Sequence, residues 1–97
     1  MFMTLSLRLK RLGFIEIENG RKQTFVLADF NRICLIIEGE YQRKIGKYLY
    51  DFYAIKTDPR TQISYYKVYC EQVPVVKLFN QASRHVQFLK GIQKQIN

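Results

Sequence analysis

Apolar and polar residues alternate on both sides of Asn19-Gly20, and many of the apolar residues there are β-branched or aromatic. The Asn-Gly dipeptide readily supplies the two positive φ angles of a type I′ turn. This pattern predicts a β-hairpin over about residues 14–27.

After Pro74, apolar residues recur every three or four positions, and proline is common in the first turn of a helix. The spacing predicts an amphipathic C-terminal helix. Its apolar stripe consists of Val75, Leu78, Phe79, Ala82, Val86, Leu89, Ile92 and Ile96.

The central segment, residues 29–48, fits two structures. Its apolar residues recur at helical spacing behind a suitable N-cap, and this spacing predicts a helix. A β-branched pair near its middle and the interior Gly39 oppose a helix. The alternative places strands over residues 33–38 and 41–55. Residues 4–12 fit a strand and a helix equally well, and both structures stay open there.

The sequence "DPRT" at residues 58–61 predicts the turn of a second hairpin. If these residues form the turn, the numbers of paired residues sum to 119. One face then carries Tyr48, Tyr50, Phe52, Ala54, Lys56, Ile63, Tyr65, Lys67 and Tyr69. The other face carries Leu49, Asp51, Tyr53, Ile55, Ser64, Tyr66, Val68 and Cys70. We expect the C-terminal helix to cover this second, more aliphatic face, which would leave the tyrosine and lysine face open.

Together these elements predict one small α+β domain over residues 1–97. It consists of an antiparallel sheet of hairpins with helices on one face, in a ββα-ββα-like order. The alternative is a β-meander or barrel closed by the C-terminal helix, similar to a PH domain.

The stretch "RLKRLGFIEIENGRKQTFVLAD" resembles the recognition helix and wing of winged-helix regulators. The resemblance covers less than a quarter of the chain. It implies a basic helix followed directly by a hairpin, and no site residue is carried over from it.

Charge changes the picture of function. The chain has 16 lysines and arginines against 8 acidic residues, a formal net charge of +8, and no acid after Glu71. Such an excess favours a polyanionic partner, with nucleic acid ahead of an acidic membrane surface.

Candidate chemistry is sparse. One histidine, His85, fits a structural role, and the two cysteines, Cys34 and Cys70, lie among apolar residues and share no metal-binding motif. The sequence therefore predicts no metal, no cofactor and no enzyme. Free thiols indicate a cytoplasmic protein, although a bridge between the two cysteines stays open. The longest apolar run, residues 33–37, is too short to span a membrane.

These observations predict a small basic protein that binds DNA or RNA, possibly single-stranded, through the tyrosine and lysine face. Bases would stack on aromatic rings while cations meet phosphates. The stacking candidates are Tyr48, Tyr50, Phe52, Tyr65 and Tyr69, and the phosphate candidates are Lys56, Lys67, Arg21, Lys22, Arg84 and Lys90. The alternative is a protein-interaction or homo-oligomeric assembly module that uses the same aromatic face.

Overall fold

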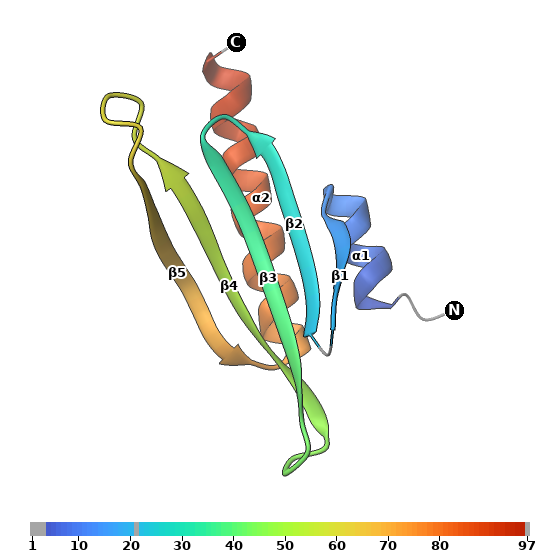
Figure 1. Ribbon diagram of the computed structural model, residues 1–97. Helices are drawn as coiled ribbons and strands as arrows, with labels where there is room; N and C mark the ends of the chain where they lie inside the picture. The colour runs from blue at the N-terminus through green and yellow to red at the C-terminus, as the bar shows by residue number, and fades with distance from the viewer. Residues whose placement is uncertain (1–3, 21, 97) are drawn as a thin grey trace.

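The computed structural model describes residues 4–20 and 22–96, which form one layer of strands and one layer of helices (Figure 1). The elements are α1 (Leu5–Leu12), β1 (Ile15–Asn19), β2 (Lys22–Phe30), β3 (Ile33–Gln42), β4 (Lys47–Thr57), β5 (Ser64–Val73) and α2 (Val75–Ile96). The strands form an open antiparallel sheet in the order β1-β2-β3-β4-β5, with both helices on one side. The predicted α+β class is confirmed, and the sheet does not close into a barrel.

The predicted central helix is wrong, because that segment forms the end of β2, all of β3 and the start of β4. Leu35 and Ile37 are buried on the helix side of the sheet, and Ile36 between them points to the opposite face. Both faces of β3 therefore carry apolar residues, and the resulting run matches helical spacing by coincidence. The β-branched residues follow their strand preference. The alternative of a meander gives the strand order correctly.

Residues 4–12, which fitted a strand and a helix equally well, contain α1. The Thr4 hydroxyl accepts a hydrogen bond from the Leu7 amide at 3.2 Å and caps the start of the helix. Gly13 ends the helix at φ 112°, and the Phe14 amide then donates to the Leu9 carbonyl at 3.0 Å. A basic helix followed by a hairpin is present, as the winged-helix resemblance implied, but β1 and β2 continue into a five-stranded sheet.

The first hairpin is confirmed, although its turn lies one residue further along the chain than predicted. Asn19 pairs with Lys22, so the loop begins at Gly20, which has φ 60°. A left-handed residue at this point is what a two-residue hairpin loop requires.

The core lies between the sheet and α2. Phe25, Ile37 and Phe52 form one row across β2, β3 and β4, and all three are fully buried. At Gly39 the sheet leaves room for the ring of Tyr50 directly opposite, since a Cβ there would overlap that ring.

Helix α2 confirms the centre of the predicted stripe, because Leu78, Ala82, Val86 and Leu89 are all buried. Val75 and Ile92 lie at its edges and are partly exposed, and the side chain of Ile96 lies outside the described residues. Arg8 of α1 lies over the Phe79 ring of α2, 5.5 Å from its centroid, and links the two helices.

The second hairpin corrects the predicted exposure of its two faces. From Thr57 and Ser64 to Tyr53 and Val68, the paired residue numbers sum to 121 instead of 119. The shift is even, so the same residues share a face, and only bulges near Phe52 alter the pairing further along.

The face that carries Tyr50 and Phe52, however, is the one that α2 covers. These residues are 4% and 0% exposed, whereas Tyr66 and Val68 on the other face are 72% and 52% exposed. The physical reason is the position of Phe52 in the sheet. Phe52 lies opposite Ile37, so β4 joins the buried row of β2 and β3 on that side.

Candidate nucleic-acid interface

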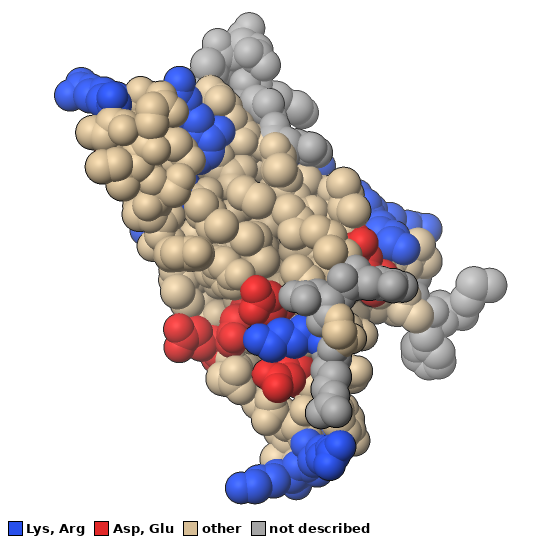
Figure 2. All heavy atoms as spheres, in the orientation of Figure 1, with Lys and Arg blue, Asp and Glu red and all other residues tan. Residues whose placement is uncertain are grey.

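The open face of the sheet does not suit a polyanion. Across its middle lies the apolar row of Ile15, Val26, Ile36, Tyr53 and Val68, one residue from each strand. Figure 2 looks onto this face and shows an uncharged centre with acidic residues gathered toward one end. The acidic pair of Glu38 and Asp51 lies directly opposite one another on β3 and β4, where it would repel phosphates.

Three of the five predicted stacking residues are not free to stack on a base. Tyr50 and Phe52 belong to the core, and the Tyr50 hydroxyl donates to Gln23 Oε1 at 3.1 Å. Tyr48 is half-buried between Tyr50 and Tyr41, with ring centroids 6.2 Å and 5.4 Å away. These residues stabilise the sheet.

The other two, Tyr65 and Tyr69, lie on the helix side of β5, which is an edge strand of the sheet. Tyr65 is 54% exposed and pairs with Lys56 across the strands, while Lys67 pairs with Ala54. The three residues Lys56, Tyr65 and Lys67 therefore point to the same side, with Tyr65 next to one lysine across the strands and to the other along β5. Tyr69 is half-buried and packs on the Phe52 ring with centroids 4.9 Å apart.

Helix α2 supplies the second wall of this region through His85 and Phe88. The His85 ring lies 4.2 Å from the Tyr69 ring and 6.3 Å from the Phe88 ring, measured between centroids. Phe88 is 62% exposed, so a large ring faces solvent beside this stack. We call Lys56, Tyr65, Lys67, Tyr69, His85 and Phe88 the aromatic–basic surface.

The electrostatics of this surface are positive. Burial lowers the pKa of His85, and the nearby charges of Lys56 and Lys67 lower it further. The imidazole is therefore neutral at pH 7, and its charged neighbours are cations. Among the described residues, the Tyr69 hydroxyl and His85 Nε2 are buried without a hydrogen-bond partner.

Two more cations border the aromatic–basic surface. At about 100° per residue, Lys77 and Arg84 lie on the same flank of α2 as Phe88. Lys77 is close enough to lower the pKa of Cys70 on β5, against the larger effect of burial, which raises it. Within the described residues, Lys56, Lys67, Lys77 and Arg84 form no ion pair, since the two that occur join Lys10 to Glu16 and Lys22 to Glu38.

The remaining predicted phosphate contacts lie elsewhere. Lys22 approaches Glu38 on the open face, with Nζ and Oε2 4.0 Å apart. Lys90 is exposed on α2, but it lies about 140° around the helix from His85. Arg21 lies outside the described residues. The structure thus brings together Tyr65, Tyr69, Lys56 and Lys67, with Arg84 at their border.

Sequence reasoning missed Phe88 and Lys77 and assigned His85 to structure alone. One signal was present: Phe88 falls outside the apolar stripe that runs through Leu89 and Ile92, so it had to point away from the centre of the sheet. Its position beside Tyr69 depends on how α2 crosses β4 and β5, and a single sequence does not contain that angle.

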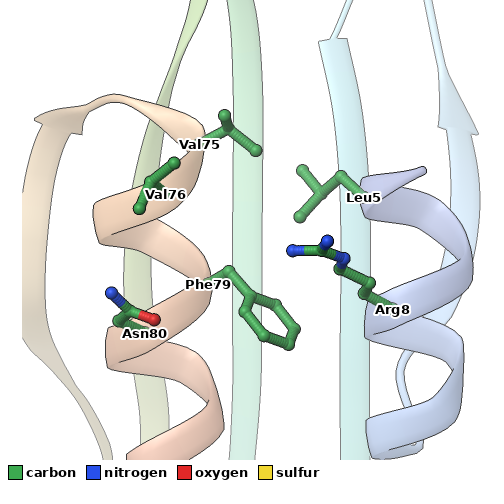
Figure 3. A pocket seen from close by; sticks show the side chains of 6 residues that line it. All are labelled: Leu5, Arg8, Val75, Val76, Phe79 and Asn80. Atoms are coloured by element: carbon green, nitrogen blue, oxygen red, sulfur yellow. The ribbon is translucent and has the colours of Figure 1, made fainter. Parts of the chain in front are cut away.

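A second cleft lies between α1 and α2 (Figure 3). It has a volume of about 210 Å³ and is lined by Leu5, Arg8, Val75, Val76, Phe79 and Asn80. Among these described lining residues the guanidinium of Arg8 is the one ionisable group, and it lies over Phe79. These six described residues include no nucleophile and no acid–base pair.

Metal and thiol chemistry find little support in the described part of the chain. Residues 4–20 and 22–96 hold no group of three potential metal ligands. Cys34 and Cys70 are free, and burial raises the pKa of each thiol, which makes it a poorer nucleophile at neutral pH. No helix in the same residues is long and apolar enough to cross a membrane.

Comparison of the chain with known protein families, with curated proteins and with solved structures finds no match. The candidate interface therefore depends on its own geometry and charge.

Proposed function

We propose that this protein binds single-stranded nucleic acid through the aromatic–basic surface. The observation that carries the proposal is the position of two exposed rings, Tyr65 and Phe88, on a surface where the nearby charges are cations without an ion-pair partner among the described residues. Lys56 and Lys67 lie on the strand side, and Arg84 borders the helix side.

Each part of this surface matches one part of the ligand. Flat rings stack on bases, and ammonium groups neutralise phosphates. A duplex hides its base faces inside the stack, so exposed rings favour an unpaired strand. The net charge of +8 adds a long-range attraction that speeds encounter with a polyanion. Contact alone performs this function, and no catalytic step belongs to it. The two free thiols support a cytoplasmic location.

The first test compares neighbouring tyrosines by fluorescence anisotropy with a labelled oligothymidylate. Tyr65→Ala removes a ring from the aromatic–basic surface and should weaken binding by about 1–3 kcal/mol. Tyr66→Ala, one residue along β5 and on the opposite face, is the matched control and should leave the affinity unchanged. Equal losses in both variants, or no binding by the wild type at low salt, would reject the proposal.

A second test uses the salt dependence of the same binding. Contacts from Lys56, Lys67, Lys77 and Arg84 predict a log–log slope of about −0.7 per contact, or roughly −3 in all. Lys67→Gln should reduce the steepness of that slope by about 0.7. Lys44→Gln, which makes the same charge change in the β3–β4 turn, should reduce the steepness of the slope much less. If both variants change it equally, the attraction is spread over the whole molecule and the surface is not the site.

A further inference from the structure

The open face of the sheet is unusually apolar for a surface in water. When one face of an antiparallel sheet meets solvent, its residues are normally polar. Here Ile15, Ile17, Tyr66 and Val68 are between 45% and 72% exposed. Such a continuous apolar face marks a contact surface for another molecule. It lies on the opposite side of the sheet from the aromatic–basic surface, so this inference does not depend on the proposed function.

The size of this face suits a protein partner. Five strands about 4.8 Å apart and about eight residues long give a face of roughly 24 × 27 Å. That area is roughly 600 Å² per copy, or about 1,200 Å² for two copies, which is at the lower limit of a specific interface.

The charges at the two ends of the open face indicate which protein covers it. Glu38, Glu40 and Asp51 lie at one end, on β3 and β4, where Lys22 Nζ lies 4.0 Å from Glu38 Oε2 and offsets part of the negative charge. Arg32 and Arg60 lie at the other end, in the β2–β3 and β4–β5 turns, and form no ion pair with the described residues. Asp58 shares the second turn and accepts a hydrogen bond from the Arg60 amide at 2.8 Å, so it offsets part of the positive charge there. The face is therefore complementary to itself when turned end over end.

We infer that the occupant of this face is a second copy of the chain. The two sheets pack face to face around a two-fold axis that runs across the strands at about Leu35, so β3 lies over β3 in the opposite direction. Counting residues from that axis places Glu38 over Arg32 of the other copy. An axis along the strands would instead place Glu38 over an acidic end and is excluded by repulsion.

This arrangement leaves α2 on the outside of both copies. The aromatic–basic surface of each copy stays exposed, and the dimer presents two of them on opposite sides. Binding of one long strand to both surfaces would then be tighter than binding to one, because the second contact is intramolecular.

The test is sedimentation equilibrium over a range of protein concentrations, with a matched pair of variants. Val68→Lys places a charge on the open face and should weaken dimerisation at least tenfold, because the amine would be buried without a partner. Val76→Lys makes the same change at a 69% exposed position on α2 and should leave the dimer intact. Ile15→Lys, at a 68% exposed position on β1, repeats the test should Val68→Lys fail to fold.

A charge exchange tests the orientation of the two copies. Arg32→Glu should weaken the dimer, and adding Glu38→Arg should restore at least part of the lost affinity, because opposite charges again meet across the axis. A wild-type monomer at every concentration would overturn the inference, as would equal effects of Val68→Lys and Val76→Lys. A double variant weaker than either single one would overturn the two-fold axis proposed.

Discussion

Replacing Phe52 and Tyr66, one at a time, gives the sharpest test of which face of the sheet is covered. Phe52→Ala empties a fully buried position at the centre of the core. Its ring packs on Tyr69 at 4.9 Å and on His85 at 6.0 Å between centroids, and both neighbours would lose contacts. Deleting a core phenylalanine costs about 3–5 kcal/mol.

That loss is large for a chain of this length. A domain of 97 residues has a total stability of roughly 5–15 kcal/mol. Each kilocalorie lost lowers the melting temperature by about 4–8 °C at this size, so Phe52→Ala should melt at least about 12 °C lower.

Tyr66→Ala removes a ring that is 72% exposed and touches the Tyr53 ring at 5.9 Å. It should cost the monomer at most about 1 kcal/mol. Urea denaturation followed by circular dichroism, at a protein concentration low enough to keep the chain monomeric, measures both variants. If Tyr66→Ala proves as costly as Phe52→Ala, the helices do not cover the face described above.

Two further predictions concern stability. Gly39→Ala should destabilise the protein by about 1–3 kcal/mol, because the added methyl overlaps the Tyr50 ring; the matched Gly91→Ala, at an open position of α2, should not destabilise it. Denaturation with urea checks both, and equal costs would contradict the close contact. The second prediction is that stability falls as pH drops below about 6.5, because burial and two lysines lower the pKa of His85 and the unfolded chain takes up its proton first. His85→Gln should flatten the change between pH 7.5 and 5.5, and an unchanged slope would show that another group causes it.

Local signals in the sequence were sufficient to predict several helices and strands. Asn19-Gly20 marked the first hairpin, and the stripe through Leu78, Ala82 and Val86 marked α2. Both depend on short-range spacing, which a single sequence contains in full.

The central strand and the covered face depended on contacts between distant residues. β3 carries apolar residues on both faces, since Leu35 lies in the core and Ile36 on the open face, and this removes the alternation that normally identifies a strand. Because β3 was not predicted, the sequence did not show that Phe52 lies in one row with Ile37 and Phe25. The face of β4 that meets α2 was therefore predicted from its aliphatic content alone. That choice put Tyr50 in solvent and Tyr66 in the core, the reverse of what is observed.

The candidate site was predictable only where its residues lie on a single hairpin. Lys56, Tyr65 and Lys67 were correctly placed on one side of the second hairpin, because an even shift in register preserves the faces. Their neighbours on α2, His85 and Phe88, required the packing of the helix against β5, which is a tertiary contact between separate elements.

The measurement that tests the central claim most directly is a titration of isotope-labelled protein with a short single-stranded oligonucleotide, followed residue by residue by NMR. We expect the largest shift changes at Tyr65, Lys67, His85 and Phe88, with Ile36 and Val68 on the open face unaffected. Absence of any shift at low salt, or shifts centred on Ile36 and Val68, would contradict nucleic-acid binding at the aromatic–basic surface.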